Sequence, residues 1–215
     1  MGYTVHKAAS PFLAYQRLRM ATRPPGLEDE SKRVLSNRIF PDMEFLKYSA
    51  ETGGAYTHVR QRVPAGERVP AHYHRLYQET FTSLSGVLTL TLDGTDLTLQ
   101  PGESGVVPIG HVHCFQNRQS PSDEKNGEVE FECRLEPGHE GFEKSWYIFY
   151  GLGREGKLGK DGVPKGLIDT CIVSALGDIQ LAGWGWTIGM PVIRYIARFA
   201  QAMGWEEQLV RKYWC

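Results

Sequence analysis

Between residues 37 and 136 the chain consists of short runs in which apolar and polar positions alternate. Such runs are typical of antiparallel β-strands, and the Gly, Pro, Asp and Asn residues between them favour tight turns. In the clearest run, 87–92, leucines alternate with threonines up to Asp93-Gly94, a dipeptide typical of a two-residue hairpin. Many short strands of this kind predict a mainly β fold, a sandwich or barrel.

After Pro137-Gly138 the apolar positions recur at a spacing closer to that of a helix. The stretches 142–152, 166–175 and 190–205 are expected to be helices, and Pro191 suits the first turn of the last one. All five tryptophans lie in this part of the chain, so it is built differently from the β region.

These patterns divide the chain into three parts. Residues 1–36 form a locally basic N-terminal arm, in which 11–20 is expected to be a short helix ended by prolines and a glycine. Residues 37–136 form a β-barrel. Residues 137–215 form a C-terminal helical extension that packs on the barrel or on a partner.

Composition excludes several classes of protein. The 215 residues include 24 Lys and Arg against 25 Asp and Glu, and the net charge of −1 argues against a nucleic-acid partner. No apolar run is long enough to span a bilayer, and the N-terminus lacks a signal-peptide pattern. The four cysteines have no C-x-x-C spacing and are expected to be free thiols. We therefore expect a cytoplasmic protein.

A first group of chemically specific residues lies before the hairpin. Gly66 is followed after five residues by His72-x-His74, after four more by Glu79 and after six more by Gly86. Two histidines spaced by two on one strand point to the same face, about 6–7 Å apart at Cα, and can converge on one metal. Glu79 lies five residues after His74, so a turn or bulge between them is required to bring it to the same site.

A second group follows the hairpin. Gly102 is followed after five residues by Pro108-x-Gly110, after two more by His113 and after three more by Asn117. His113 would close the site from a distant strand. Three imidazoles and one carboxylate suit Fe, Mn, Ni, Co or Zn, so the predicted metal ligands are His72, His74, Glu79 and His113.

Together the two groups match both halves of the cupin signature, and the chain resembles single-domain, quercetinase-like cupin-2 proteins. The resemblance implies a cupin barrel, which is a double-stranded β-helix or jelly roll, with the N-terminal arm and the C-terminal helices added to it. It also implies a divalent metal and a small-molecule substrate. Fe(II) is the ion first expected, with Mn, Ni, Co or Zn as alternatives.

A divalent ion with one carboxylate ligand leaves a local charge near +1, which favours substrates that offer an anionic oxygen. We therefore expect a metal-dependent, dioxygenase-like oxidoreductase that acts on a small enolic, phenolic or carboxylate substrate and in which Glu79 also moves a proton. Two alternatives use the same ligands. One is a non-redox isomerase, decarboxylase or cyclase, and the other is a small-molecule-binding cupin without catalysis.

Several side chains close to the two motifs are expected to form the walls of the pocket. They are Tyr77, Phe81, Leu90, His111 and Phe115. Cys114, next to His113 on the same strand, is expected to face away from the metal.

The helix expected at 190–205 carries a narrow polar stripe of Arg194, Arg198 and Gln201, and apolar residues fill its remaining faces. Such a helix packs on the barrel or on a second copy in a homodimer, or it lies in a membrane interface with its arginines at the headgroups. A homodimer and a peripheral membrane contact are therefore both expectations for this helix.

Overall fold

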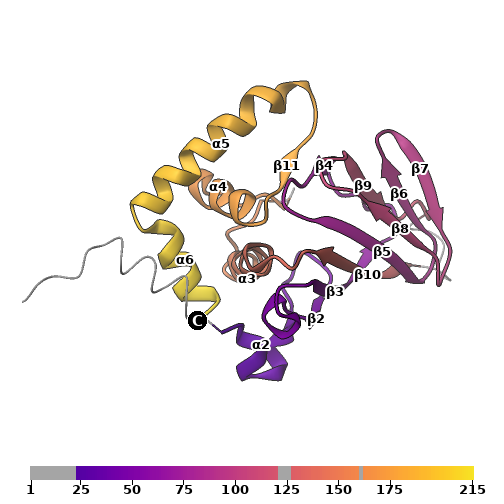
Figure 1. Ribbon diagram of the computed structural model, residues 1–215, viewed down its shortest axis with the longest axis horizontal. Helices are drawn as coiled ribbons and strands as arrows, with labels where there is room; N and C mark the ends of the chain where they lie inside the picture. Colours follow the sequence, from indigo (N-terminus) through magenta and orange to yellow (C-terminus); the bar gives the residue numbers. More distant parts are fainter. Residues whose placement is uncertain (1–22, 121–126, 160–161) are drawn as a thin grey trace, which may run out of the picture.

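The computed structural model describes residues 23–120, 127–159 and 162–215. Two antiparallel sheets lie on one side of the molecule, and the helices that follow them in the chain lie on the other (Figure 1). This arrangement confirms the predicted fold class, a β-barrel with C-terminal helices. The helix expected at 11–20 lies outside the described residues.

The first sheet has six strands. In spatial order they are β1 (Val34–Leu35), β2 (Met43–Lys47), β3 (Thr57–Pro64), β10 (Glu128–Glu136), β5 (Gln78–Ser85) and β8 (Ser104–Val107). The second sheet has five strands. In spatial order they are β11 (Gln180–Leu181), β4 (His72–Tyr73), β9 (His113–Gln116), β6 (Leu88–Leu92) and β7 (Thr95–Leu99). Thus the N-terminal arm and the C-terminal extension each contribute one strand.

The alternating apolar and polar positions form the expected hairpin and an apolar core between the sheets. Asp93 and Gly94 join β6 to β7 with φ values of 47° and 83°, which are the positive angles that a two-residue hairpin turn requires. Phe81 of β5 and Phe131 of β10 point inward, and they pack with Leu90 of β6 in a core between the sheets. The predicted hairpin is therefore confirmed.

The remaining elements are helical. Short turns are α2 (Pro25–Glu28), η1 (Glu30–Arg33) and η2 (Ser49–Thr52), and longer helices are α3 (Glu140–Arg154), α4 (Leu167–Leu176), α5 (Trp184–Ala202) and α6 (Trp205–Tyr213). Within the described ranges, no helix is both long and apolar enough to cross a membrane.

The predicted start of the helix at residue 190 is wrong. Gly183, with a φ of 124°, lies two residues after the end of the short strand β11 and allows α5 to begin at Trp184. Pro191 consequently lies inside α5 rather than in its first turn, on an exposed position of the helix.

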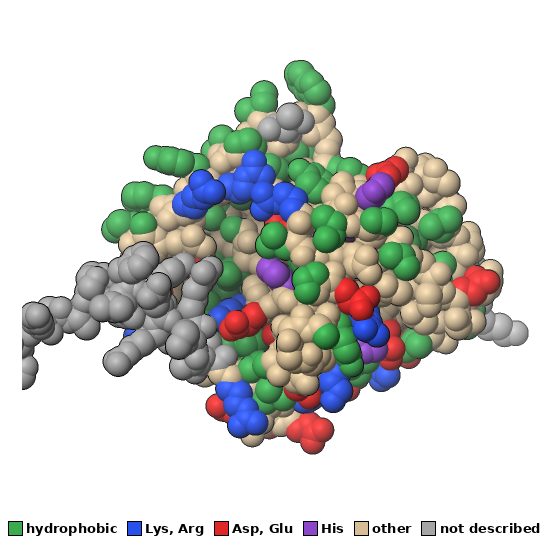
Figure 2. Space-filling model, viewed as in Figure 1, with side chains coloured by type: hydrophobic (Ala, Val, Ile, Leu, Met, Phe, Trp, Pro, Cys, Tyr) green, Lys and Arg blue, Asp and Glu red, His purple; other side chains and the backbone are tan. Residues whose placement is uncertain are grey.

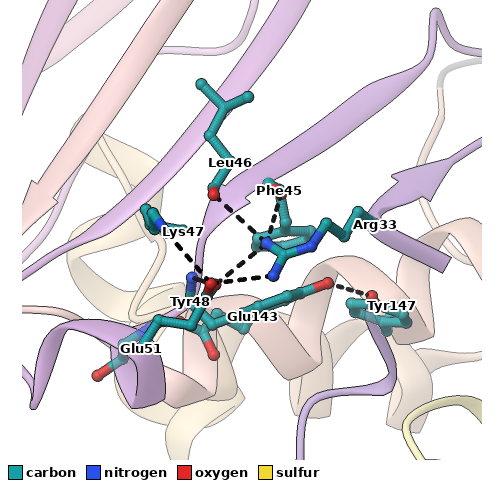
Figure 3. A network of polar contacts seen from close by, with 9 residues as sticks. Arg33, Phe45, Leu46, Lys47, Tyr48, Glu51, Glu143 and Tyr147 are labelled. Atoms are coloured by element: carbon teal, nitrogen blue, oxygen red, sulfur yellow. Dashed lines mark hydrogen bonds and ion pairs between the residues drawn. The ribbon is translucent and has the colours of Figure 1, made fainter. Parts of the chain in front are cut away.

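A buried polar network fixes α3 to the first sheet (Figure 3). Glu143 Oε1 accepts hydrogen bonds from the Ser49 backbone N–H at 2.6 Å and from Thr57 Oγ1 at 2.7 Å. The hydroxyl groups of Tyr48 and Tyr147 lie 2.6 Å apart. Burial raises the pKa of Glu143 to about 7, although the bonds from Ser49 and Thr57 act in the opposite direction. The helix is thus held by a carboxyl group that is largely removed from water.

The N-terminal segment is held at the same place. Arg33 forms a bidentate ion pair with Glu51, with N–O distances of 3.0 and 3.1 Å, and also donates to the Phe45 carbonyl at 3.2 Å (Figure 3). At the other end of the chain, Trp214 is fully buried and packs its ring edge-on against Tyr147, with centroids 5.0 Å apart. Both ends of the described chain therefore take part in the barrel-side core.

Candidate metal centre

The four predicted metal ligands lie together between the two sheets. His72 is in β4 and His74 follows that strand directly, while His113 is in the adjacent strand β9 and pairs with His72 across the ladder. Glu79 comes from β5 of the first sheet. One ligand atom from each residue lies within 4.8 Å of the others. The structure therefore brings together residues that the chain separates by up to about forty positions.

The position of Glu79 confirms that the chain turns between His74 and the glutamate. Residues 75–77 carry the chain from the second sheet to the first, where Glu79 pairs with Leu135 of β10 and Val107 of β8. A straight strand would have turned this carboxylate to the opposite face, as its odd spacing from His74 indicates.

Each histidine has its Nδ1 atom close to a backbone carbonyl oxygen. The distances are 2.8 Å from His72 to Pro70, 3.1 Å from His74 to Asp178 and 3.4 Å from His113 to His111. A neutral imidazole that donates through Nδ1–H keeps the lone pair of Nε2 free for a metal. The carbonyl partners therefore orient the rings as ligands.

Three atoms that face the centre of the cluster, His74 Nε2, His113 Nε2 and Glu79 Oε2, are buried without a hydrogen-bond partner. Glu79 Oε2 lies 2.8 Å from His113 Nε2 and 3.4 Å from His74 Nε2, but neither contact is aligned as a hydrogen bond. Buried polar atoms without partners are costly, and they are expected where an ion satisfies them. The donor set fits a divalent transition metal.

The protonation states of Glu79 and His72 also suit the binding of a cation. Burial alone would raise the pKa of Glu79, but the His74 and His113 imidazoles hold it well below its usual value. Burial together with the neighbouring His113 and His74 rings lowers the pKa of His72 to about 3. Burial lowers the pKa of His74 as well, but the Glu79 carboxylate outweighs it and raises that pKa. Glu79 is thus a carboxylate and His72 a neutral imidazole, the states that metal binding requires.

Three of the aromatic residues expected in the pocket surround the cluster. The Phe81 ring lies 6.0 Å from the His113 ring and 5.4 Å from the Phe115 ring, measured between centroids. Tyr77 stacks on His74 at 4.4 Å, and its hydroxyl donates to the Gly177 carbonyl at 2.6 Å. Phe81 and Phe115 thus form an apolar wall beside His113, and Tyr77 covers the His74 ring.

The other two expected pocket residues lie farther out. Leu90 is fully buried in β6 and pairs with Phe115 of β9, so it belongs to the core behind the aromatic wall. His111 is exposed, and its Nδ1 lies 2.6 Å from Asp93 Oδ2 at the β6–β7 hairpin. His111 therefore belongs to that hairpin contact and not to the four-residue cluster.

Cys133 is a neighbour of the cluster that sequence reasoning missed. Its thiol donates to Glu79 Oε1 at a distance of 3.7 Å, and burial raises its pKa well above the usual value. The sequence did indicate that this side chain faces inward, because Cys133 lies on the same face of β10 as the buried Val129, Phe131 and Leu135.

Asp178, between α4 and β11, is a second missed neighbour. Its carbonyl accepts from His74, and its carboxylate accepts from the backbone N–H groups of Arg75 at 2.6 Å and Leu76 at 2.9 Å. The Arg75 guanidinium lies 2.7 Å from the same carboxylate. Because Asp178 is almost fully buried, the C-terminal extension fixes the loop that carries His74.

The part of the chain that holds this cluster is similar to known proteins. Residues 59–122 match the family model described as Cupin domain. A quercetin 2,3-dioxygenase of Bacillus subtilis is 37% identical over 65 residues, which are 30% of this chain and 19% of that enzyme. The chain thus spans about a fifth of the length of this relative.

Two solved structures are among those similar to part of the chain. A predicted oxalate decarboxylase from Thermotoga maritima has 23% identity and a TM-score of 0.39, covering 45% of this chain and 79% of its own. KdgF from Halomonas sp. has 12% identity and a TM-score of 0.42, covering 52% of this chain and 94% of its own. Residues 59–122, which hold all four residues of the cluster, form a cupin domain.

Proposed function

We propose that the protein is a metal-dependent cupin enzyme, an oxidoreductase of the dioxygenase type that acts on a small enolic, phenolic or carboxylate substrate. The observation that carries this proposal is the cluster of three histidines and one glutamate, in which atoms of His74, His113 and Glu79 are buried without partners. The relative named quercetin 2,3-dioxygenase supports the same class of reaction over the 65 matched residues.

His72, His74, His113 and Glu79 would hold the ion, with Fe(II) the first candidate. When bound, a divalent ion supplies Lewis acidity toward an anionic substrate oxygen, and Fe(II) adds redox chemistry with dioxygen. The single carboxylate ligand leaves part of the positive charge uncompensated, so it favours enolates, phenolates and carboxylates over neutral molecules.

The residues of the chain itself have three further tasks. Phe81 and Phe115 exclude water from one side of the cluster. His72 keeps partial exposure, whereas the other three ligands are buried, so the substrate approaches from the side of His72. Glu79 is the carboxylate placed to accept a proton from a substrate hydroxyl group.

The test begins with the metal content of the full chain, expressed without a chelating tag in metal-supplemented cells. Elemental analysis is expected to find about one ion per chain. An oxygen electrode then follows turnover of phenolic and 1,3-dicarbonyl compounds, and we expect oxygen consumption that matches product formation. Turnover that proceeds unchanged without oxygen would contradict the dioxygenase and favour isomerisation, decarboxylation or cyclisation. Far less than one ion would contradict every metal-dependent reaction.

A further inference from the structure

Helix α5 exposes a continuous apolar stripe to solvent. The side chains of Trp184, Ile188, Val192, Tyr195, Phe199 and Met203 are each between 52% and 91% exposed. Their spacing of three or four residues places them on one face, extending just past the end of the helix. Met190, Ala197 and Ala200 are buried on the opposite face, which packs on the rest of the extension. The outward stripe is therefore not the core-facing side of the helix.

A basic cavity lies on the side of α5 that faces α4 and β11, and it reaches the edge of the stripe at Arg198, which follows Tyr195 by three residues. It has a volume of about 340 Å³ and its lining includes Arg75, Arg194, Arg198, Gln180 and Gln201, with no acidic residue among the described residues that line it. Figure 2 shows the blue side chains gathered between α5 and the sheets, with hydrophobic side chains projecting along the outer edge of the helix. The positive charge and the exposed apolar stripe thus lie on different sides of α5 and meet at Arg198.

The arginines of the cavity differ in how far their charge is compensated. Arg75 is paired with Asp178, and Arg194 donates to the neutral Gln180 side chain at 2.9 Å. Arg198 is exposed and forms no ion pair within the described part of the chain. Arg194 and Arg198 are the only charged residues of α5, so the helix carries two positive charges and no negative one.

We propose that α5 binds an anionic lipid bilayer, with the apolar stripe inserted at the level of the upper acyl chains and Arg198, at the edge of the stripe, holding a lipid phosphate. A helix that combines aromatic and aliphatic side chains with flanking arginines fits the boundary between headgroups and acyl chains. The absence of acidic residues on α5 matches a negatively charged surface. This contact goes beyond the proposed function and uses none of the metal ligands.

A second copy of the chain fits the same surface less well. In a two-fold interface the stripe of one α5 would face the stripe of the other, which would place Arg198 of both copies at the border of the contact. Since α5 offers no carboxylate to separate these charges, the contact would carry uncompensated repulsion. A lipid surface supplies the missing negative charges as phosphates.

Vesicle sedimentation with the full chain tests the proposal. We expect the protein to pellet with vesicles of phosphatidylcholine that contain phosphatidylserine, and to do so much less with pure phosphatidylcholine or at high salt. Arg198→Gln is expected to lower binding about fivefold. The double variant Ile188→Ser with Tyr195→Ser is expected to lower it at least about tenfold, because two exposed apolar side chains no longer insert.

Matched controls lie on the barrel. Val106→Ser with Ile109→Ser changes two half-exposed apolar side chains, and Arg62→Gln removes an exposed arginine of β3; both are expected to bind vesicles like the wild type. Circular dichroism and thermal melting verify that each variant is folded. The proposal is overturned by failure of the wild type to bind anionic vesicles, or by stripe variants that bind equally well. It is also overturned if sedimentation equilibrium shows a dimer that the stripe variants dissociate.

Discussion

The β region and the C-terminal extension contribute to the candidate metal centre in opposite ways. The β region supplies all four ligand side chains, at spacings that identify the cupin motifs. The extension supplies no ligand, yet Asp178 holds the loop of His74, and Trp214 completes the barrel-side core. The difference teaches that a metal site can be encoded in one region and stabilised by another that carries no motif.

The largest expected effect tests the role of the β region as the sole source of ligands. His113→Ala removes one imidazole from the buried cluster, and we expect metal content to fall from about one ion per chain to a small fraction of that. His111→Ala is the matched control, because this histidine lies two residues away but contacts Asp93 in solvent. Elemental analysis of both variants decides the matter, and equal loss in the two would refute the ligand assignment.

The next prediction tests whether the extension is part of the barrel's core. Trp214→Ala is expected to lower the free energy of unfolding by about 3–5 kcal/mol, because it empties a fully buried site. Trp184→Ala is expected to change it by less than about 0.5 kcal/mol, since that side chain is 91% exposed. Denaturant unfolding gives both values, and similar effects for the two tryptophans would mean that the extension folds apart from the barrel.

A smaller effect concerns the contact of α3 with the first sheet. The pKa of Glu143 is about 7 in the folded protein against an ordinary value of 4.5, so the stability it contributes is present at low pH and lost as pH rises through about 7. We expect unfolding free energy to fall by about 2 kcal/mol between about pH 5 and 8 from this group. In Glu143→Gln the unfolding free energy should change less over this pH range. Glu140→Gln, an exposed neighbour on α3, should retain the full change.

The smallest predicted effect tests whether the extension influences metal affinity at the site that the β region forms. Asp178→Asn weakens the hold on the loop after His74, and we expect affinity for the metal to fall about tenfold. Asp93→Asn is the control, since Asp93 shares a positive φ and a bond to a backbone N–H but lies at the hairpin. Titration against a competing chelator measures both, and unchanged affinity in Asp178→Asn would show that the extension does not tune the site.

Much of the β region could be predicted because its signals are local. Alternation of apolar residues specifies inward and outward faces, and Asp93-Gly94 specifies a hairpin. His72 and His74 share a face by their spacing, and Glu79 required a turn that the structure contains. Each of these inferences depends on residues within a few positions of one another.

The contacts of the extension could not be predicted in this way. Asp178 and His74 are 104 positions apart, and no periodicity connects them. His111 was expected in the pocket because it lies two residues before His113, but its bond to Asp93 depends on where the hairpin folds back. The start of α5 also escaped prediction, because Pro191 is tolerated inside the helix at an exposed position.

The pairing of β11 with β4 has a consequence for the accuracy of the ligand geometry. β4 has only two residues and pairs with β9 at a single position, His72 with His113. A register slip of one residue would turn Tyr73 towards the centre and both histidines of the motif away from it. On the opposite edge, β11 adds two paired positions, Gln180 with Tyr73 and Leu181 with His72. The strand that contributes none of the four cluster residues therefore fixes which side chains of its neighbour reach the candidate metal centre.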